Sequence, residues 1–227
     1  MDVVISDSAV QTVLYVFEAI GVVAFAISGV VAAVRARLDL VGVIVIALLT
    51  ALGGGTIRDL LLDRSPFFWV IHQEYLWIII GLSLVGAMVL RSRHFDLTER
   101  AIQWPDALGL GVFAASGAQL ALQVDSSPLI ATMMGVITAS VGGILRDILL
   151  NKVPWSVASY QHYAIIAFAG GWLVWGLNEL GTSPAISVAV SALVIATWRV
   201  LAIAFNWQLP NWRRDDYTGP INLPQHQ

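Results

Sequence analysis

The chain has 227 residues, of which 58% are hydrophobic and 12% are charged, whereas a typical soluble domain has about 25% charged residues. With a mean hydropathy of +0.78, this composition indicates an integral membrane protein. The net charge of −3 argues against a nucleic-acid partner, and the absence of cysteine excludes disulfides and thiolate chemistry. The four histidines are scattered, so we expect no metal, no cofactor and no catalytic residue, and therefore no enzyme.

Seven apolar stretches are long enough to cross a membrane. A hydrocarbon core about 30 Å thick requires roughly 20 helical residues. The predicted spans are 11–34, 40–62, 75–91, 104–122, 129–150, 162–178 and 183–206. The sequence thus predicts an all-α protein with one transmembrane domain over 1–206. The polar, proline-containing segment 207–227 is expected to be a flexible cytoplasmic tail.

Loop charges predict the orientation of these spans. With seven crossings, eight Lys and Arg residues fall in loops and the tail on one side, and only Arg64 falls on the other. Because positive charge is retained on the cytoplasmic side, we expect an inner-membrane protein with the N-terminus outside and the C-terminus inside.

The chain repeats itself at a constant offset of 88 residues. The segment GGTIRDLLLDRSP, which begins at Gly54, aligns without a gap on GGILRDILLNKVP, which begins at Gly142. Apolar sequences match by composition alone, but coincident Arg, Asp and Pro residues indicate a duplication. Repeat one covers about 11–91 and repeat two about 104–178, while span 183–206 has no partner and is expected at the periphery or in a subunit interface.

Each repeat contains three spans, so the second copy must cross the membrane in the opposite sense. Inverted repeats of this kind place a pseudo-two-fold axis in the membrane plane. Binding sites or pathways commonly form near the midplane, where discontinuous helices of the two halves meet.

Glycines interrupt the middle of the second and fifth spans. Each costs a helix interior about 1 kcal/mol relative to alanine, so the sequence predicts kinks that free backbone carbonyls. Close packing of helices through small residues is the alternative, and the two roles are compatible. The predicted hinge residues are Gly53, Gly54, Gly55, Gly142 and Gly143.

A charged pair follows each glycine cluster: Arg58 with Asp59, and Arg146 with Asp147. Charges at this depth are costly unless they are paired or hydrated. Two interpretations remain open, namely that these residues line or gate a pore, or that each Arg only holds the kink by binding carbonyls or a carboxylate.

Other polar residues also recur in both repeats. Glu18 and Asp106 are candidate vestibule residues that attract cations, although an interfacial role suits both equally. For Asp106, which follows Trp104 and Pro105, a helix N-terminal role is favoured. Arg199, near the end of the last span, is expected to reach lipid phosphates. Candidate pore-lining residues, which can alternatively bond their own backbone, are Ser28, Thr50, Ser116 and Thr138.

The duplicated motif and the 3+3+1 arrangement resemble the prokaryotic trimeric intracellular cation (TRIC) channel family, which also carries a glycine-transporter domain label. The resemblance covers about residues 10–206. It implies a homotrimer in lipid, with one hourglass pore per protomer bordered by the kinked second and fifth spans. Potassium is the implied permeant ion, with sodium as a further monovalent cation.

Sequence reasoning leaves a second function open. Inverted repeats are common in secondary transporters, so a carrier of a small zwitterion such as glycine is the alternative to a passive channel. No TVGYG filter occurs in the chain, so a channel would be only modestly selective.

Overall fold

The structure is a computed structural model that describes the backbone of residues 2–92, 98–154 and 162–207, with side chains described for 12–90, 98–154 and 162–207. Among these residues, seven long helices of 17 to 34 residues overlap the seven predicted ranges, and the single-turn α3 precedes α4. The predicted tail lies outside the described residues except for Trp207. The helices are α1 (Asp2–Arg35), α2 (Leu40–Leu61), α3 (Phe68–Ile71), α4 (Glu74–Ser92), α5 (Glu99–Gln123), α6 (Pro128–Leu149), α8 (Tyr163–Glu179) and α9 (Pro184–Ala204).

Within the described residues, four helices are both long and apolar enough to cross a membrane: Thr12–Arg35 of α1, α2, α6 and α9. The apolar part of α4, Glu74–Leu90, is shorter. Seven crossings therefore stay a prediction. In α5 the helix begins at Glu99, before the predicted start at 104, and Pro105 lies inside it. The central position of α5 explains its lower apolarity, because protein rather than lipid surrounds most of it.

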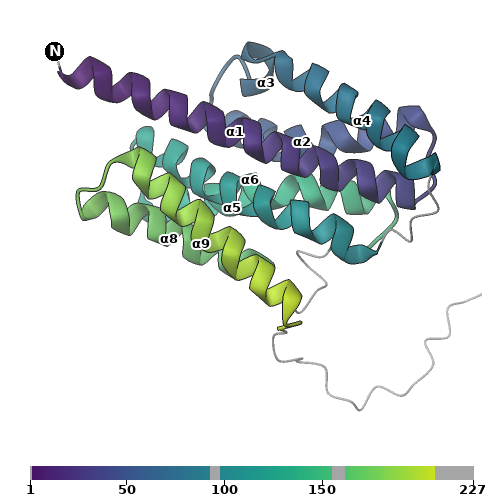
Figure 1. The fold of residues 1–227 in the computed structure, drawn as a ribbon. Helices are drawn as coiled ribbons and strands as arrows, with labels where there is room; N and C mark the ends of the chain where they lie inside the picture. The colour runs from purple at the N-terminus through teal and green to yellow at the C-terminus, as the bar shows by residue number, and fades with distance from the viewer. Residues whose placement is uncertain (1, 93–97, 155–161, 208–227) are drawn as a thin grey trace, which may run out of the picture.

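Four helices form the centre of the molecule. Helix α1 packs on α2 and α5, and α6 packs on α2 and α5. Helix α4 covers α1 and α2 on one side, while α8 and α9 lie on the opposite side against repeat two, as Figure 1 shows. The unrepeated α9 packs mainly on α5 and α8, so it belongs structurally to the second half.

Equivalent helices of the two repeats run antiparallel. Gly21 of α1 faces Phe113 of α5, and Gly109 of α5 faces Phe25 of α1, so the contact is the same when the repeats are exchanged. The Phe25 and Phe113 rings meet with centroids 5.3 Å apart. This reciprocal packing is the structural form of the inverted repeat that the 88-residue offset predicts.

The turns that end the helices repeat at the same offset. Arg37 and Asp125 both have positive φ, and so do Asp63 and Asn151. A left-handed residue is a common helix C-terminal cap, and Asn and Asp tolerate this conformation better than most residues. The duplication therefore extends to backbone conformation at the helix ends.

The expected kinks are not confirmed. Helical structure continues through Gly53, Gly54 and Gly55 in α2, and through Gly142 and Gly143 in α6. The two helices contact each other directly at Gly53, Gly54 and Gly142, whereas Gly55 faces the Phe68 ring of α3. Here the glycines allow two helix backbones to approach each other, which is the packing role that small residues play in membranes.

Candidate functional site

Two clusters of buried charged residues lie at opposite ends of the bundle. We call Glu18, Arg58, Asp59 and Arg64 the repeat-one cluster, which lies where α2 ends. The repeat-two cluster lies where α6 ends and consists of Ser28, Asp106, Arg146 and Asp147. The structure thus brings together most of the polar residues that the duplicated motif singles out.

Arg58 is the centre of the repeat-one cluster and is fully buried. Its Nη1 lies 2.8 Å from Oε1 of Glu18 on α1, and its Nη2 lies 2.8 Å from Oδ1 of Asp59. Those terminal nitrogens are at ion-pair distance but are not aligned for hydrogen bonds, whereas Nε donates to Asp59 Oδ1 at 2.9 Å. One arginine therefore links α1 to the end of α2 through two carboxylates.

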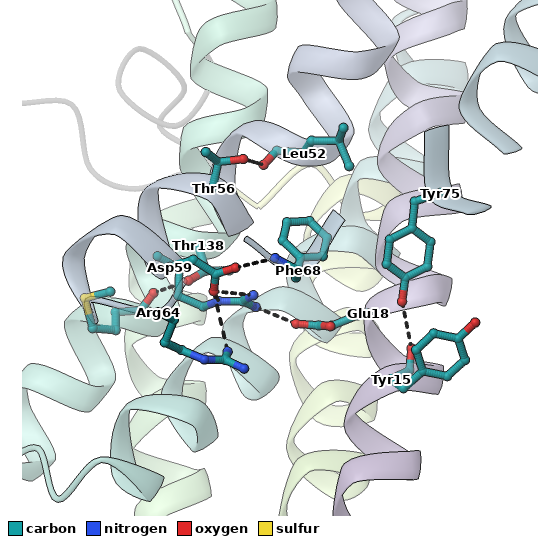
Figure 2. Close-up of polar contacts among 11 residues, drawn as sticks. Tyr15, Glu18, Leu52, Thr56, Asp59, Arg64, Phe68, Tyr75 and Thr138 are labelled. Carbon is teal, nitrogen blue, oxygen red and sulfur yellow. Dashed lines mark hydrogen bonds and ion pairs between the residues drawn. The ribbon is translucent and has the colours of Figure 1, made fainter. Parts of the chain in front are cut away.

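The carboxylate of Asp59 is held from several directions, as Figure 2 shows. The backbone N–H of Phe68 donates to Oδ2 at 2.8 Å, and Nη1 of Arg64 lies 3.5 Å from Oδ1. The Arg58 guanidinium also lies 5.3 Å from the centroid of the Phe68 ring. Asp59 therefore fixes the start of α3 against the end of α2.

The repeat-two cluster is built in the same way around Arg146. Its Nη1 donates to Asp106 Oδ1 on α5 at 2.8 Å, and its Nε donates to Asp147 Oδ1 at 2.8 Å. Nη1 also donates to the hydroxyl of Ser28 at 2.6 Å, and that hydroxyl donates to the Ile102 carbonyl. Arg146 thereby joins α1, α5 and α6.

Each arginine contacts the aspartate that follows it in the chain, although adjacent residues of a helix point about 100° apart. The long arginine side chain turns back on its neighbour in both repeats, through Nε. Each arginine binds carboxylates, but the kink that it was expected to hold is not confirmed. A pore-lining or gating role stays a prediction.

The two predicted vestibule carboxylates are components of these clusters. Asp106 is 1% exposed and lies inside α5, so the helix N-terminal role is wrong for it. Glu18 is 8% exposed and borders a cavity of about 430 Å³ at the repeat-one end. The cavity is lined by Thr12, Leu14, Tyr15, Glu18, Arg64, Phe68, Ile71, His72 and Leu120.

Between the clusters, α2 and α6 touch through backbone atoms. A Cβ added to Gly54 would clash with the Thr138 carbonyl oxygen, and one added to Gly142 would clash with that of Thr50. Each of these two contacts corresponds to the other when the two repeats are exchanged. We call these two contacts the waist, and in this conformation they close the space between α2 and α6.

The remaining predicted hydroxyls differ in their contacts. Thr50 donates to the Ile46 carbonyl and Thr138 to the Met134 carbonyl, both at 2.6 Å, so each bonds its own helix. Only Ser28 reaches a charged cluster, while Ser116 is buried and its hydroxyl makes no hydrogen bond to the described residues.

Sequence reasoning missed two groups near these clusters. At the repeat-one end, Glu74 accepts from the Tyr15 hydroxyl at 3.0 Å and lies 3.0 Å from His72 Nδ1. At the other end Arg199 is 1% exposed, with its guanidinium 5.0 Å from the Tyr163 ring centroid, so the expected lipid contact is wrong.

Comparison with known proteins places this geometry in context. The family described as Glycine transporter matches residues 15–91 and 103–179, which are the two repeats. A UPF0126 membrane protein from Vibrio cholerae is 38% identical over 90% of this chain and 84% of its own length. The UPF0126 inner membrane protein YadS of Escherichia coli is 34% identical over 89% of this chain and 98% of its own length.

Solved structures share the fold. A TRIC cation channel is 37% identical with a TM-score of 0.78, covering 88% of this chain and 97% of that one. The TRIC trimeric intracellular cation channel orthologue from Rhodobacter sphaeroides is 31% identical with a TM-score of 0.80, and the match covers 87% of this chain and 100% of that one. A prokaryotic TRIC channel in 0.5 M KCl is 28% identical with a TM-score of 0.81, and the match covers 88% of this chain and 100% of that one.

Proposed function

The chain belongs to the prokaryotic TRIC channel family, which includes the UPF0126 membrane proteins, and we propose that it conducts monovalent cations, chiefly potassium. The observation that carries this proposal is the agreement of nearly the whole fold with cation channels at up to 37% identity. The paired clusters and the cavity beside Glu18 support it, because they place carboxylates at both ends of the bundle.

The proposed pathway runs within one protomer, between α1, α2, α5 and α6. It leads from the cavity at the repeat-one cluster, past the waist, to the repeat-two cluster. In the described conformation α2 and α6 touch at the waist, so a pathway that crosses it would require these two helices to separate there. Gly53, Gly54, Gly55, Gly142 and Gly143 would serve as hinges in that movement, because glycine tolerates backbone changes that other residues resist.

The low net charge of the clusters, zero for the repeat-one cluster and −1 for the repeat-two cluster, sets the expected selectivity. Arg58 balances one carboxylate and Arg146 balances another, so neither end carries the dense ring of uncompensated acids that a strongly selective filter uses. We expect potassium and sodium to pass with a modest preference. A homotrimer is proposed because the solved relative is described as trimeric.

Liposome reconstitution tests the proposal. A channel should pass potassium at a rate that follows the imposed voltage and without a coupled counter-ion. Uptake of radiolabelled glycine into the same liposomes tests the carrier alternative, and saturable uptake coupled to an ion gradient would overturn the channel assignment. Protein with both Arg58 and Arg146 replaced by Gln is a control for a pathway through the clusters, since unchanged currents would exclude that pathway.

A further inference from the structure

Arg64 is held much less firmly than the other arginine of its cluster. The Arg58 side chain is fully buried and contacts carboxylate oxygens at 2.8–2.9 Å, whereas the Arg64 side chain is 37% exposed and lies 3.5 Å from Asp59. Arg64 follows α2 in the turn at Asp63, and its side chain borders the cavity of about 430 Å³. Its guanidinium can therefore move between Asp59 and the cavity.

Asp59 does not depend on Arg64 for its position. The Phe68 backbone N–H and the Arg58 Nε hold its two oxygens at 2.8 and 2.9 Å. If Arg64 swings away, the carboxylate stays in place beside a cavity that Glu18 also borders. The cluster then has two acids and one arginine, so it changes from neutral to a net charge of −1.

We propose that Arg64 is a tethered competitor for the permeant cation at the repeat-one mouth. In its inward position its guanidinium occupies the place beside Asp59 where a monovalent cation would bind. An incoming cation exchanges with it, and the side chain moves into the cavity. This inference rests on the proposed channel function and assigns it a residue that sets cation occupancy at one mouth.

The other half of the molecule offers a matched control. Lys152 stands at the position of Arg64 in repeat two, but it is exposed, and no ion pair joins it to the residues that the structure describes. The second arginine near the repeat-two cluster is instead Arg199 on α9, which is buried with its guanidinium over the ring of Tyr163. A mobile competitor is thus expected at one mouth only.

The test measures single-channel current against potassium concentration, varied separately on each side of a planar bilayer. For R64Q we expect the half-saturating concentration to fall about threefold to tenfold, as removal of one nearby charge predicts at the high dielectric of a solvent-exposed site. The shift should appear only when potassium is varied on the Arg64 side. K152Q removes the same charge at the equivalent position and should behave as the unsubstituted protein.

Chemical restoration of the charge guards against a folding artefact. Because the chain has no cysteine, R64C can be modified at a single thiol in channels that already conduct. A methanethiosulfonate carrying a trimethylammonium group should raise the half-saturating concentration again, and a neutral reagent of similar size should not.

Three results would overturn the inference while leaving the channel intact: equal curves for R64Q and K152Q, a shift on the opposite side, or equal effects of the charged and neutral reagents. Absence of any potassium current from the unsubstituted protein would instead refute the proposed function. The two failures are therefore distinguishable in one set of recordings.

Discussion

At the scale of single residues, the buried arginines organise both ends of the bundle. Isolated charges inside a membrane protein are costly, and removal of one member of a buried pair leaves the other uncompensated. Arg58 and Arg146 avoid this cost by contacting two carboxylates each, one on the same helix and one on a different helix. The clusters therefore contribute to stability as well as to the proposed pathway.

Replacing Arg58 by Gln should lower the free energy of unfolding by about 3 kcal/mol, because Glu18 is left buried without a cation and Asp59 keeps only the more distant Arg64. Adding Glu18→Gln to that variant should recover part of the loss, whereas Glu18→Gln alone should be destabilising. Unfolding of all variants in mixed detergent micelles measures the coupling. Simple addition of the two single effects would show that the pair does not interact.

Arg199 should be coupled energetically to the ring of Tyr163. In a double-mutant cycle with Arg199→Ala and Tyr163→Leu, we expect a coupling of about 0.5–2 kcal/mol, the range of a cation–π contact. Tyr163→Phe keeps the ring and removes only the hydroxyl that donates to the Ala139 carbonyl, so it should retain most of that coupling. A lipid-facing Arg199 would show no coupling to either variant.

At the scale of helices, the crossing of α2 and α6 determines how closely the two halves meet. Thr50 and Thr138 supply the carbonyls that face Gly142 and Gly54, and Leu145 faces Gly53. A side chain larger than hydrogen at the crossing would force the backbones apart. Packing at the crossing explains Gly54 and Gly142 without a break in either helix.

Gly54→Ala should destabilise the protein by about 1–3 kcal/mol, as overpacking does in a dense core. Gly81→Ala in α4 is the matched control, because no atom lies within 4 Å of a Cβ at that position. It should be neutral or stabilising, since alanine favours a helix by about 1 kcal/mol over glycine. Thermal denaturation in detergent compares the two, and equal effects would argue against a tight crossing.

At the scale of the whole molecule, the two halves are arranged about a pseudo-two-fold axis. The pairs Gly21–Phe113 and Gly54–Thr138 each recur with the repeats exchanged. The two charged clusters consequently lie at opposite ends, and α9 breaks the equivalence by packing on repeat two. The ends therefore share a plan but differ in their second arginine.

The orientation of these ends in the membrane can be measured with single cysteines. Ala36 follows α1 at one end and Gln123 ends α5 at the other, and both are exposed. Loop charges predict that Gln123→Cys reacts with a membrane-impermeant maleimide in intact cells, and that Ala36→Cys reacts only after the membrane is opened. The reverse pattern would invert the predicted topology. The unsubstituted chain, which has no cysteine, supplies the background.

The sequence by itself determined the membrane class, the approximate ranges of the long helices, the duplication and the residues at both clusters other than Arg64. These follow from apolar run length and from a constant offset, which are local or linear properties of the chain. The family resemblance also followed from the sequence, since the duplicated motif could be read directly.

The tertiary structure alone decided what the glycines and arginines contact. Whether Gly54 bends α2 or accepts another helix depends on where the Thr138 carbonyl lies, and no spacing within α2 encodes that position. Arg146 likewise pairs with Asp106, which lies 40 residues away in the chain. Arg199 is buried because α8 brings Tyr163 beneath it. Backbone approach and charge pairing are distances between segments, so they exist only once the helices have packed.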